Sequence, residues 1–360
     1  MIYFLLALVP MLIPFFAKYF FKTEFTIQEM ILACVAPSIV IALIYIGGTY
    51  NEMADTEVLS GQVVKKERKE VSCRHSYSCH CYTYYTGSGK NRTSHRRCKT
   101  CYDHRYDVDW NVMSTLGDVS IPKEDRQGLV EPKRWSVVNV GDPYATTSSY
   151  INYVKGAKDS LFNLEKYTPA KLSSVPEYPG NIYDIYKIDR VVDIGAGVSN
   201  IRQLNDGISN ILTTLGKDKQ VNIVMAVTTQ PRDYAYIIRD KWLGGKKNDV
   251  IITVGSKHYP KVDWVEVFSW SKEPMVNITL RDDLQSLGDM SDVNQVMAVI
   301  AKDVGKHYVR KPMKEFEYLE GQIQPSGTVI FWALFIGTFV SFCLTLWGIK
   351  SDVFGNERRY

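Results

Sequence analysis

The chain has little net charge and no long block of one sign. Among its 360 residues, 43 are Lys or Arg and 39 are Asp or Glu, which gives a formal net charge of +4. The basic residues are spread along the sequence and interleaved with acidic ones. A nucleic-acid-binding domain usually concentrates its basic residues on one face. The sequence therefore predicts no nucleic-acid partner.

Recognisable catalytic motifs are also scarce. The histidines of the C-terminal half, His258 and His307, belong to no Ser–His–acid arrangement that can be argued from the sequence. A glycine-containing turn at residues 195–197 lies between an expected strand and an expected helix. It lacks the third glycine of a dinucleotide-binding fingerprint and the lysine of a P-loop. These gaps disfavour a triad hydrolase and a nucleotide-binding enzyme.

Long apolar runs, by contrast, occupy both ends of the chain. They cover residues 2–21, 31–46 and 328–349. An α-helix needs about 20 predominantly apolar residues to cross the hydrocarbon core of a bilayer. The first and third runs have this length, and the second reaches it with the residues on either side. We therefore expect two transmembrane helices within residues 1–48 and a third at residues 327–349.

A cleaved signal peptide is the alternative for the first run. Signal peptides begin with a basic region and end at small residues. No Lys or Arg precedes this run, and its far end reads Phe-Phe-Ala-Lys-Tyr-Phe-Phe. These flanks favour a retained helix.

The short loops predict the orientation, because Lys and Arg in short loops mark the cytoplasmic side. Lys18 and Lys22 lie between the first two runs, and Lys350, Arg358 and Arg359 lie in the tail at residues 350–360. With three spans, this loop and this tail fall on the same side. We predict an integral protein of an inner or plasma membrane with a cytoplasmic C-terminus. The body between the second and third spans is then extracytoplasmic, in a periplasm or an equivalent space.

Cysteine and histidine are concentrated in one segment. Five of the seven cysteines and four of the six histidines fall between residues 73 and 104. Structural zinc sites bring two close ligand pairs to one tetrahedral centre. Here a C-x-C pair is followed by a C-x-x-C pair and then by a histidine three residues later. This spacing predicts one structural zinc ion, with the candidate ligands Cys79, Cys81, Cys98, Cys101 and His104.

Disulfide bonds are the alternative reading of this segment, because an extracytoplasmic compartment permits oxidation. The C-x-C pair departs from the usual zinc spacing, whereas an odd number of cysteines is awkward for disulfides alone. Residues 58–71 and 106–112 have strand-like patterns on either side. Zinc or disulfides would therefore cross-link the tip of a β-hairpin.

The body divides into three predicted parts. Residues 49–150 form a small β-rich domain that carries the Cys/His segment, with further strands at 116–120 and 135–141. Residues 151–182 form a connector. Residues 183–320 alternate strands and helices, which predicts a three-layer α/β domain. The expected strands are 187–194, 221–227, 249–254 and 262–268, with a further candidate at 276–280, and the expected helices are 199–215, 234–242 and 293–308. Gly216 is expected to end the first of these helices. The fold class is thus a membrane-anchored α+β protein.

Several short motifs in this part follow a known order. Asp193 to Gly197 precede the first helix, a second helix ends in Trp242-Leu-Gly-Gly245, and Asn248-Asp249 begin an apolar strand. In this order residues 191–309 resemble the TPM domain family of bacterial envelopes and thylakoid lumens. The resemblance implies a membrane-anchored domain outside the cytoplasm. Some members are acid phosphatases, and acidic residues of some bind divalent cations.

The sequence gives little support for the phosphatase activity of some TPM family members. The family's Gly-rich, Glu-containing segment after the third strand is replaced by residues 270–275 and 280–284, which contain no glycine. Asp193, Asp249, Asp282 and Asp283 are the candidate carboxylates for a cation, and helix caps or solvated surface are the alternative roles. We therefore expect a non-enzymatic protein that binds an envelope partner or supports a membrane complex. A metal-dependent hydrolase of the phosphatase type is the alternative.

Overall fold

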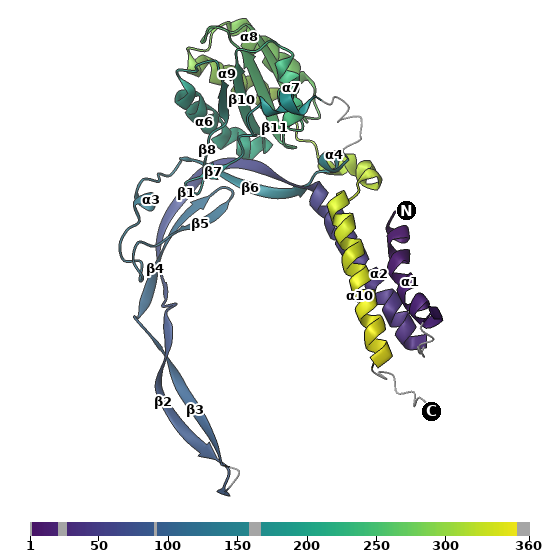
Figure 1. Ribbon diagram of the computed structural model, residues 1–360. Helices are drawn as coiled ribbons and strands as arrows, with labels where there is room; N and C mark the ends of the chain where they lie inside the picture. The colour runs from purple at the N-terminus through teal and green to yellow at the C-terminus, as the bar shows by residue number, and fades with distance from the viewer. Residues whose placement is uncertain (1, 21–26, 90–91, 158–166, 351–360) are drawn as a thin grey trace. The chain divides into compact units, whose positions relative to one another are not determined.

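The computed structural model describes residues 2–20, 27–89, 92–157 and 167–350 (Figure 1). The chain divides into two compact units. One contains Met1–Glu57, Ser149–Leu172 and Lys311–Tyr360, and the other contains Val58–Ser148 and Ser173–Arg310. Lys22 and the predicted tail beyond Lys350 lie outside the described residues.

Three apolar helices pack together in the first unit: α1 (Ile2–Phe20), α2 (Ile27–Met53) and α10 (Gly327–Lys350). By length and composition, α2 and α10 can cross a membrane, whereas the apolar segment of α1 is shorter, Leu8–Phe20. Ile41 and Ala333 are fully buried where the helices meet. Gly337 permits this approach, since a Cβ there would stand 2.6 Å from the Ile41 side chain.

The outer surface of these helices is apolar. On α10 the aromatic side chains of Phe335, Phe339 and Trp347 are exposed, and exposed aliphatic residues such as Ile39 and Leu43 line α2. Exposed apolar surface of this extent is unusual for a soluble protein but suits contact with lipid.

Short elements complete the first unit. They are α4 (Tyr153–Gly156), α5 (Pro169–Ser173) at its edge and the 3₁₀-helix η3 (Met313–Gln322). Asp55 accepts hydrogen bonds from the Tyr150 hydroxyl and the Asn152 amide, each at 2.9 Å. Gly156 packs against Ile323 and Met53, where a Cβ would clash.

A four-stranded sheet with the order β5-β4-β1-β6 begins the second unit. Its strands are β1 (Ala54–Ser72), β4 (Tyr106–Ser114), β5 (Gly117–Ile121) and β6 (Pro143–Ile151). Val63, Val108, Trp110 and Val112 are buried in its core. This part is the β-rich region expected from the strand patterns.

The prediction of a strand at residues 135–141 is wrong. The structure has a short helix there, α3 (Lys133–Ser136), followed by a loop. The Trp135 ring lies 4.7 Å from the Trp110 ring, and the Trp135 indole donates to the Asn111 carbonyl. Trp135 in α3 and Val138 in the loop therefore cover the sheet core without forming a strand.

A second sheet has the order β12-β11-β10-β9, with β9, β10 and β11 parallel and β12 antiparallel. The strands are β9 (Val191–Ile194), β10 (Asn222–Thr228), β11 (Asp249–Gly255) and β12 (Trp264–Ser269). A small hairpin, β7 (Ile182–Tyr183) and β8 (Lys187–Ile188), precedes them. Every residue of β10 and β11 is buried, as a sheet covered on both faces requires.

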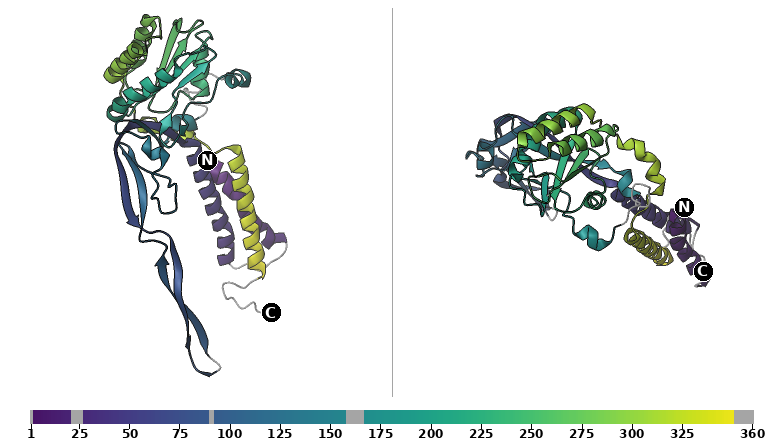
Figure 2. Two further views of the ribbon diagram at one scale, coloured as in Figure 1. Left: turned by 90° about the vertical axis from the view of Figure 1, so that its left-hand side faces the viewer. Right: turned by 90° about the horizontal axis from the view of Figure 1, so that it is seen from above.

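Helices cover both faces of this sheet (Figures 1 and 2). Ile223, Met225 and Val227 point to the face covered by α6 (Ile201–Lys219), α8 (Met275–Leu287) and α9 (Val293–His307). Val224 and Ala226 point to the other face, which α7 (Tyr234–Lys241) covers. Alternate side chains of β10 thus belong to two hydrophobic cores, one on each face of the sheet, as expected for a three-layer α/β arrangement.

Two local predictions in this region are wrong. The candidate strand at 276–280 lies within α8, where Val276, Leu280 and Leu284 are buried at helical spacing. The helix expected to stop at Gly216 continues to Lys219 and ends at Gln220, whose φ is +53°. Gly216 instead allows close packing, because a Cβ there would lie 2.8 Å from the backbone carbonyl carbon of Ser60 in β1.

Candidate functional site

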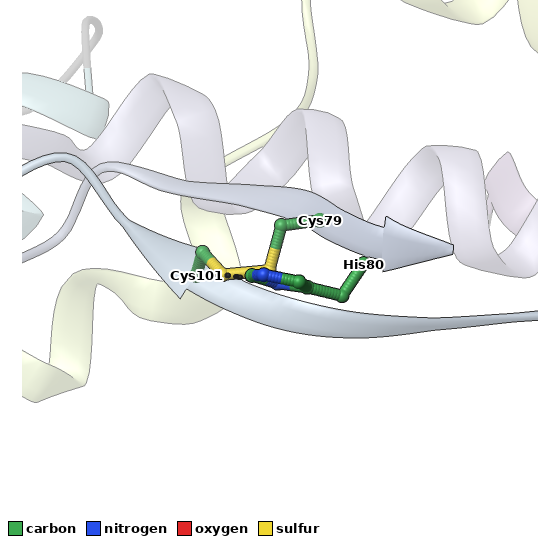
Figure 3. A group of neighbouring side chains, drawn as sticks. All are labelled: Cys79, His80 and Cys101. Carbon is green, nitrogen blue, oxygen red and sulfur yellow. Dashed lines mark hydrogen bonds between the residues drawn. A yellow bond between two sulfur atoms is a disulfide. The ribbon is translucent and has the colours of Figure 1, made fainter. Parts of the chain in front are cut away.

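The Cys/His segment forms a two-stranded antiparallel hairpin of β2 (Ser76–Thr86) and β3 (Thr93–Tyr102). Two disulfides cross it, joining Cys79 to Cys101 and Cys81 to Cys98. Figure 3 shows the first of them with the His80 ring alongside, 3.8 Å from the Cys101 sulfur. We refer to residues 76–102 as the hairpin.

A β-bulge explains why a C-x-C pair can match a C-x-x-C pair. The ladder pairs Cys79 with Lys99 and Tyr82 with Arg97, so β2 contains one extra residue. His80 has a φ of +46°, in the left-handed region. Side chains alternate along a strand, so Cys98 and Cys101 point to opposite faces. The extra residue in β2 places Cys79 and Cys81 on opposite faces as well, and each face then carries one disulfide.

This pairing corresponds to the disulfide alternative and not to the expected four-thiolate zinc site. Zinc binds deprotonated thiols, and a sulfur in a disulfide is not one. Zinc on Cys79, Cys81, Cys98 and Cys101 would therefore require reduction of both disulfides. The fifth expected ligand, His104, lies outside the hairpin.

The hairpin surface is aromatic and basic. Five tyrosines on it are 43–57% exposed: Tyr77, Tyr82, Tyr84, Tyr85 and Tyr102. The hairpin sequence also contains five basic residues and no Asp or Glu: Lys90, Arg92, Arg96, Arg97 and Lys99. The low net charge of the whole chain conceals this local excess. Among the described residues of its unit, no helix lies against β2 or β3 in Figure 1 or in the left view of Figure 2.

A second group of chemically active residues lies where the chain enters and leaves the hairpin. β1 pairs with β4 so that Ser72 faces Tyr106 and Val71 faces Asp107. Cys73 follows β1, and His104 precedes β4. The ligand atoms of Cys73, His104 and Asp107 lie within 4.8 Å of one another. We call these three residues the hairpin-base cluster. The Cys73 thiol is free and 6% exposed, and Asp107 is fully buried.

Asp107 is held as a carboxylate. Its Oδ1 faces His104 Nε2, and its Oδ2 accepts the Arg74 amide N–H at 3.1 Å and lies 3.5 Å from the Lys123 ammonium. Burial acts to raise the pKa of Asp107, but these hydrogen bonds and charges outweigh it and lower the pKa to about 2. Asp107 therefore contributes a negative charge to the cluster at neutral pH.

His75 extends the cluster. Its amide N–H donates to the Cys73 sulfur at 3.4 Å, and its ring lies 5.6 Å from the His104 ring. Its Nε2 lies 3.0 Å from the Arg126 carbonyl oxygen. A carbonyl only accepts, so Nε2 carries the proton and Nδ1 of the neutral ring keeps its lone pair. Thiol, imidazole and carboxylate donors therefore gather at one place, where Cys73 and Asp107 are buried and the two histidines are partly exposed.

Asp193, the first of the four candidate carboxylates, stabilises the loop that follows β9. Asp193 Oδ1 accepts the amide N–H groups of Ala196 and Gly197, and its Oδ2 accepts that of Val198, at 2.8–3.2 Å. Gly195 and Gly197 have positive φ angles, which this turn requires. The carboxylate thus satisfies backbone donors.

Asp249 belongs to a buried polar network at the start of β11. It accepts hydrogen bonds from Tyr178 at 2.8 Å and Asn222 at 2.9 Å. Asn222 in turn accepts from Arg190, a buried guanidinium that also donates to Ser60 in β1. This network links the two sheets, and reasoning from sequence missed it because Arg190 lies in no motif.

Asp282 and Asp283 lie on the exposed side of α8. Asp282 pairs with Arg281 at 2.9 Å, and Asp283 pairs with Lys302 at 2.8 Å. Asp193 lies near the end of β9 whereas Asp249 begins β11, and β9 and β11 are both parallel to β10. The four acidic residues therefore do not converge on one site.

Reasoning from sequence also missed the hairpin-base cluster. From the sequence, Cys73 and His75 are only spare candidate ligands of the Cys/His segment, and Asp107 lies in an expected strand. The combination of an odd cysteine with a H-x-x-D spacing at residues 104–107 was the available signal.

Known proteins give no further indication of the role of this chain. No family model, no curated protein and no solved structure matches it. The similarity to the TPM domain family therefore stays an expectation that rests on the quoted motifs alone.

Proposed function

We propose that this chain is an integral membrane protein whose extracytoplasmic body binds a protein partner of the envelope through the hairpin, without catalysing a reaction. The observation that carries the proposal is the hairpin surface. It exposes five tyrosines and contains five basic residues without an acidic one. Tyr and Arg are the residue types that contribute most to protein interfaces.

The disulfides support a binding role. An isolated two-stranded hairpin is at best marginally stable in water. Two cross-links hold the strands together although the hairpin has almost no core of its own. A preorganised surface loses less conformational entropy on binding, so its contacts contribute more to affinity.

The hairpin composition defines the partner by its charge. Five basic side chains favour an acidic surface, and Arg92 already lies 4.1 Å from the Tyr85 ring centre, so that charge and aromatic surface are combined. We infer an envelope protein with an acidic patch.

Membrane placement follows from the apolar helices. We propose that α1 spans the membrane together with α2 and α10, with the basic loop and tail in the cytoplasm and the body outside. Disulfides persist mainly in oxidising compartments, so the two in the hairpin support the exterior side. Residues 191–309 are proposed to form a TPM-like domain, and the engaged carboxylates of this domain favour a binding role over metal-dependent hydrolysis.

Site-specific photo-crosslinking in native membranes tests the proposal. A photoreactive residue at Tyr84 should give a discrete protein adduct, and the double variant R96E/R97E should abolish it. Ile278 on α8 is the matched control, because both side chains are 43% exposed. Equal adducts at both positions, or adducts only to lipid or nucleic acid, would contradict the proposal.

Reporter fusions test the orientation separately. A reporter fused after Tyr360 should be active in the cytoplasm, and one inserted at Gly87 should be active outside it. The reverse pattern would refute the proposed topology.

A further inference from the structure

The disulfides leave one cysteine of the Cys/His segment unpaired. Four of its five cysteines are cross-linked, and the fifth, Cys73, keeps a free and buried thiol. A buried free cysteine often acts as a small apolar residue. Cys73 instead lies beside two imidazoles and a carboxylate, so apolar packing does not account for its surroundings.

We propose that Cys73, His75, His104 and Asp107 bind one structural zinc ion at the base of the hairpin. These ligands differ from the five candidates that the sequence favoured, four hairpin cysteines and His104, and share only His104 with them. The proposal is independent of partner binding by the hairpin.

The placement of the ligands fits a structural site. Zinc binds sulfur at about 2.3 Å and nitrogen or oxygen at about 2.0–2.2 Å, so tetrahedral ligands stand roughly 3.3–3.8 Å apart. The ligand atoms of the hairpin-base cluster lie within 4.8 Å of one another. Movements of about 1 Å or less would bring these three atoms to bonding distance, whereas His75, which is not in this group and whose ring lies 5.6 Å from the His104 ring, would have to move further. A C-x-H pair enters the hairpin and a H-x-x-D pair leaves it, so the ion would tie the two chain segments together.

The surrounding hydrogen bonds orient the donors as metal sites require. The Arg126 carbonyl accepts the Nε2–H of His75, which leaves Nδ1 as the ligand atom. The Arg74 amide and Lys123 contact Oδ2 of Asp107, which leaves Oδ1 directed at His104. The His75 amide donates to the Cys73 sulfur and would stabilise a thiolate.

The charges balance in this arrangement. On binding, Cys73 loses its thiol proton, and His104 binds as a neutral imidazole whose one ring proton is on Nδ1, so that Nε2, which faces Asp107, is the ligand atom. The ion then contributes two positive charges, against one negative charge each from the Cys73 thiolate and the Asp107 carboxylate. A nearly neutral buried site avoids most of the cost of an unpaired buried charge.

A catalytic reading of the same residues is less consistent with the structure. A nucleophilic cysteine must reach a substrate, and Cys73 is 6% exposed. A catalytic zinc ion keeps an open coordination position, whereas four protein ligands close the site.

Metal analysis of the untagged full-length protein in detergent tests the proposal. We expect about one zinc ion per chain, with near-complete loss in C73S and in H104Q. His95→Gln is the matched control, because His95 is a hairpin histidine outside the cluster and should retain the metal. C81S/C98S should also retain it. Replacement by Co²⁺ should give a thiolate-to-cobalt charge-transfer band that C73S removes.

Two results would overturn the proposal. One is zinc at background level after equilibration with micromolar zinc. The other is zinc that C81S/C98S removes and C73S retains, which would assign the metal to the hairpin cysteines. Non-reducing mass spectrometry of each variant should show the expected disulfides intact, so that a misfolded variant is recognised. If C73S fails this check, the wild-type zinc content and the Co²⁺ band decide the question.

Discussion

Gly216→Ala tests the packing of α6 against β1, because two opposite effects act on one added methyl group. Gly216 lies in the interior of α6, close to its C-terminal end. Alanine in a helix interior is favoured over glycine by about 1 kcal/mol. On helix propensity alone, the variant would therefore be stabilised.

The contact with Ser60 opposes this gain. A Cβ at position 216 would lie 2.8 Å from both the carbonyl carbon and the Cβ of Ser60, and closer still to its carbonyl oxygen. Backbone atoms cannot move aside as a flexible side chain can. Overpacking of this kind costs about 1–3 kcal/mol. We expect a net destabilisation of about 1–2 kcal/mol, since the overlap involves β1 backbone on one side and helix backbone on the other.

Two other helix glycines provide matched controls. A Cβ at Gly305 in α9 would meet only Leu215 at 3.5 Å, an ordinary contact. Gly305→Ala should therefore stabilise the protein by about 0.5–1 kcal/mol. A Cβ at Gly207 in α6 would meet the flexible Met297 side chain at 2.8 Å, so Gly207→Ala should be close to neutral.

Chemical unfolding of the full-length protein in detergent micelles, followed by tryptophan fluorescence, would rank the three variants. The expected order of stability is Gly305→Ala, then Gly207→Ala, then Gly216→Ala. A Gly216→Ala variant as stable as Gly305→Ala would show that β1 does not lie against α6, and the reasoning would fail.

Two further predictions concern Asp249 and the hairpin disulfides. Burial raises the pKa of the Asp249 carboxyl to about 6, against hydrogen bonds from Lys246, Asn222 and Tyr178. Between about pH 4 and 6, Asp249 keeps its proton in the folded protein and releases it in the unfolded chain. The contribution of Asp249 to the free energy of unfolding therefore decreases as the pH rises, by ~3 kcal/mol in all. Asp249→Asn should flatten this part of the pH profile of unfolding, and an unchanged slope would contradict the assignment. Replacing Cys81 and Cys98 by Ser should speed proteolysis within the hairpin and leave the unfolding midpoint of the α/β region unchanged, whereas a lower midpoint would show that the hairpin contributes to the core.

The elements with strong local signals were predictable. Residues 221–227 and 249–254 are short, nearly continuous apolar runs, and they form β10 and β11 with every residue buried. The apolar runs at 31–46 and 328–349 likewise correspond to α2 and α10. In both cases the residues that decide the structure are neighbours in the sequence.

The wrong or missed predictions concern features that depend on residues far apart in the sequence. Gly216 was read as a helix stop from local propensity, but its role depends on Ser60, more than 150 residues earlier. The choice between zinc and disulfides depended on one extra residue in β2, at His80, which no spacing rule reveals. The hairpin-base cluster unites Cys73 and Asp107 only through the register of β1 and β4.

The hairpin is held by interactions that replace a hydrophobic core. Its strands are exposed along almost their whole length, and two-stranded ribbons of this kind are at best marginally stable alone. Disulfides at Cys79 and Cys81 hold the strands, and the hairpin-base cluster lies where the hairpin joins β1 and β4. Buried side chains would have stabilised the same ribbon without cross-links, but they would also have covered its surface. Cross-links leave the tyrosines and the described basic residues exposed, as the proposed binding of another protein requires.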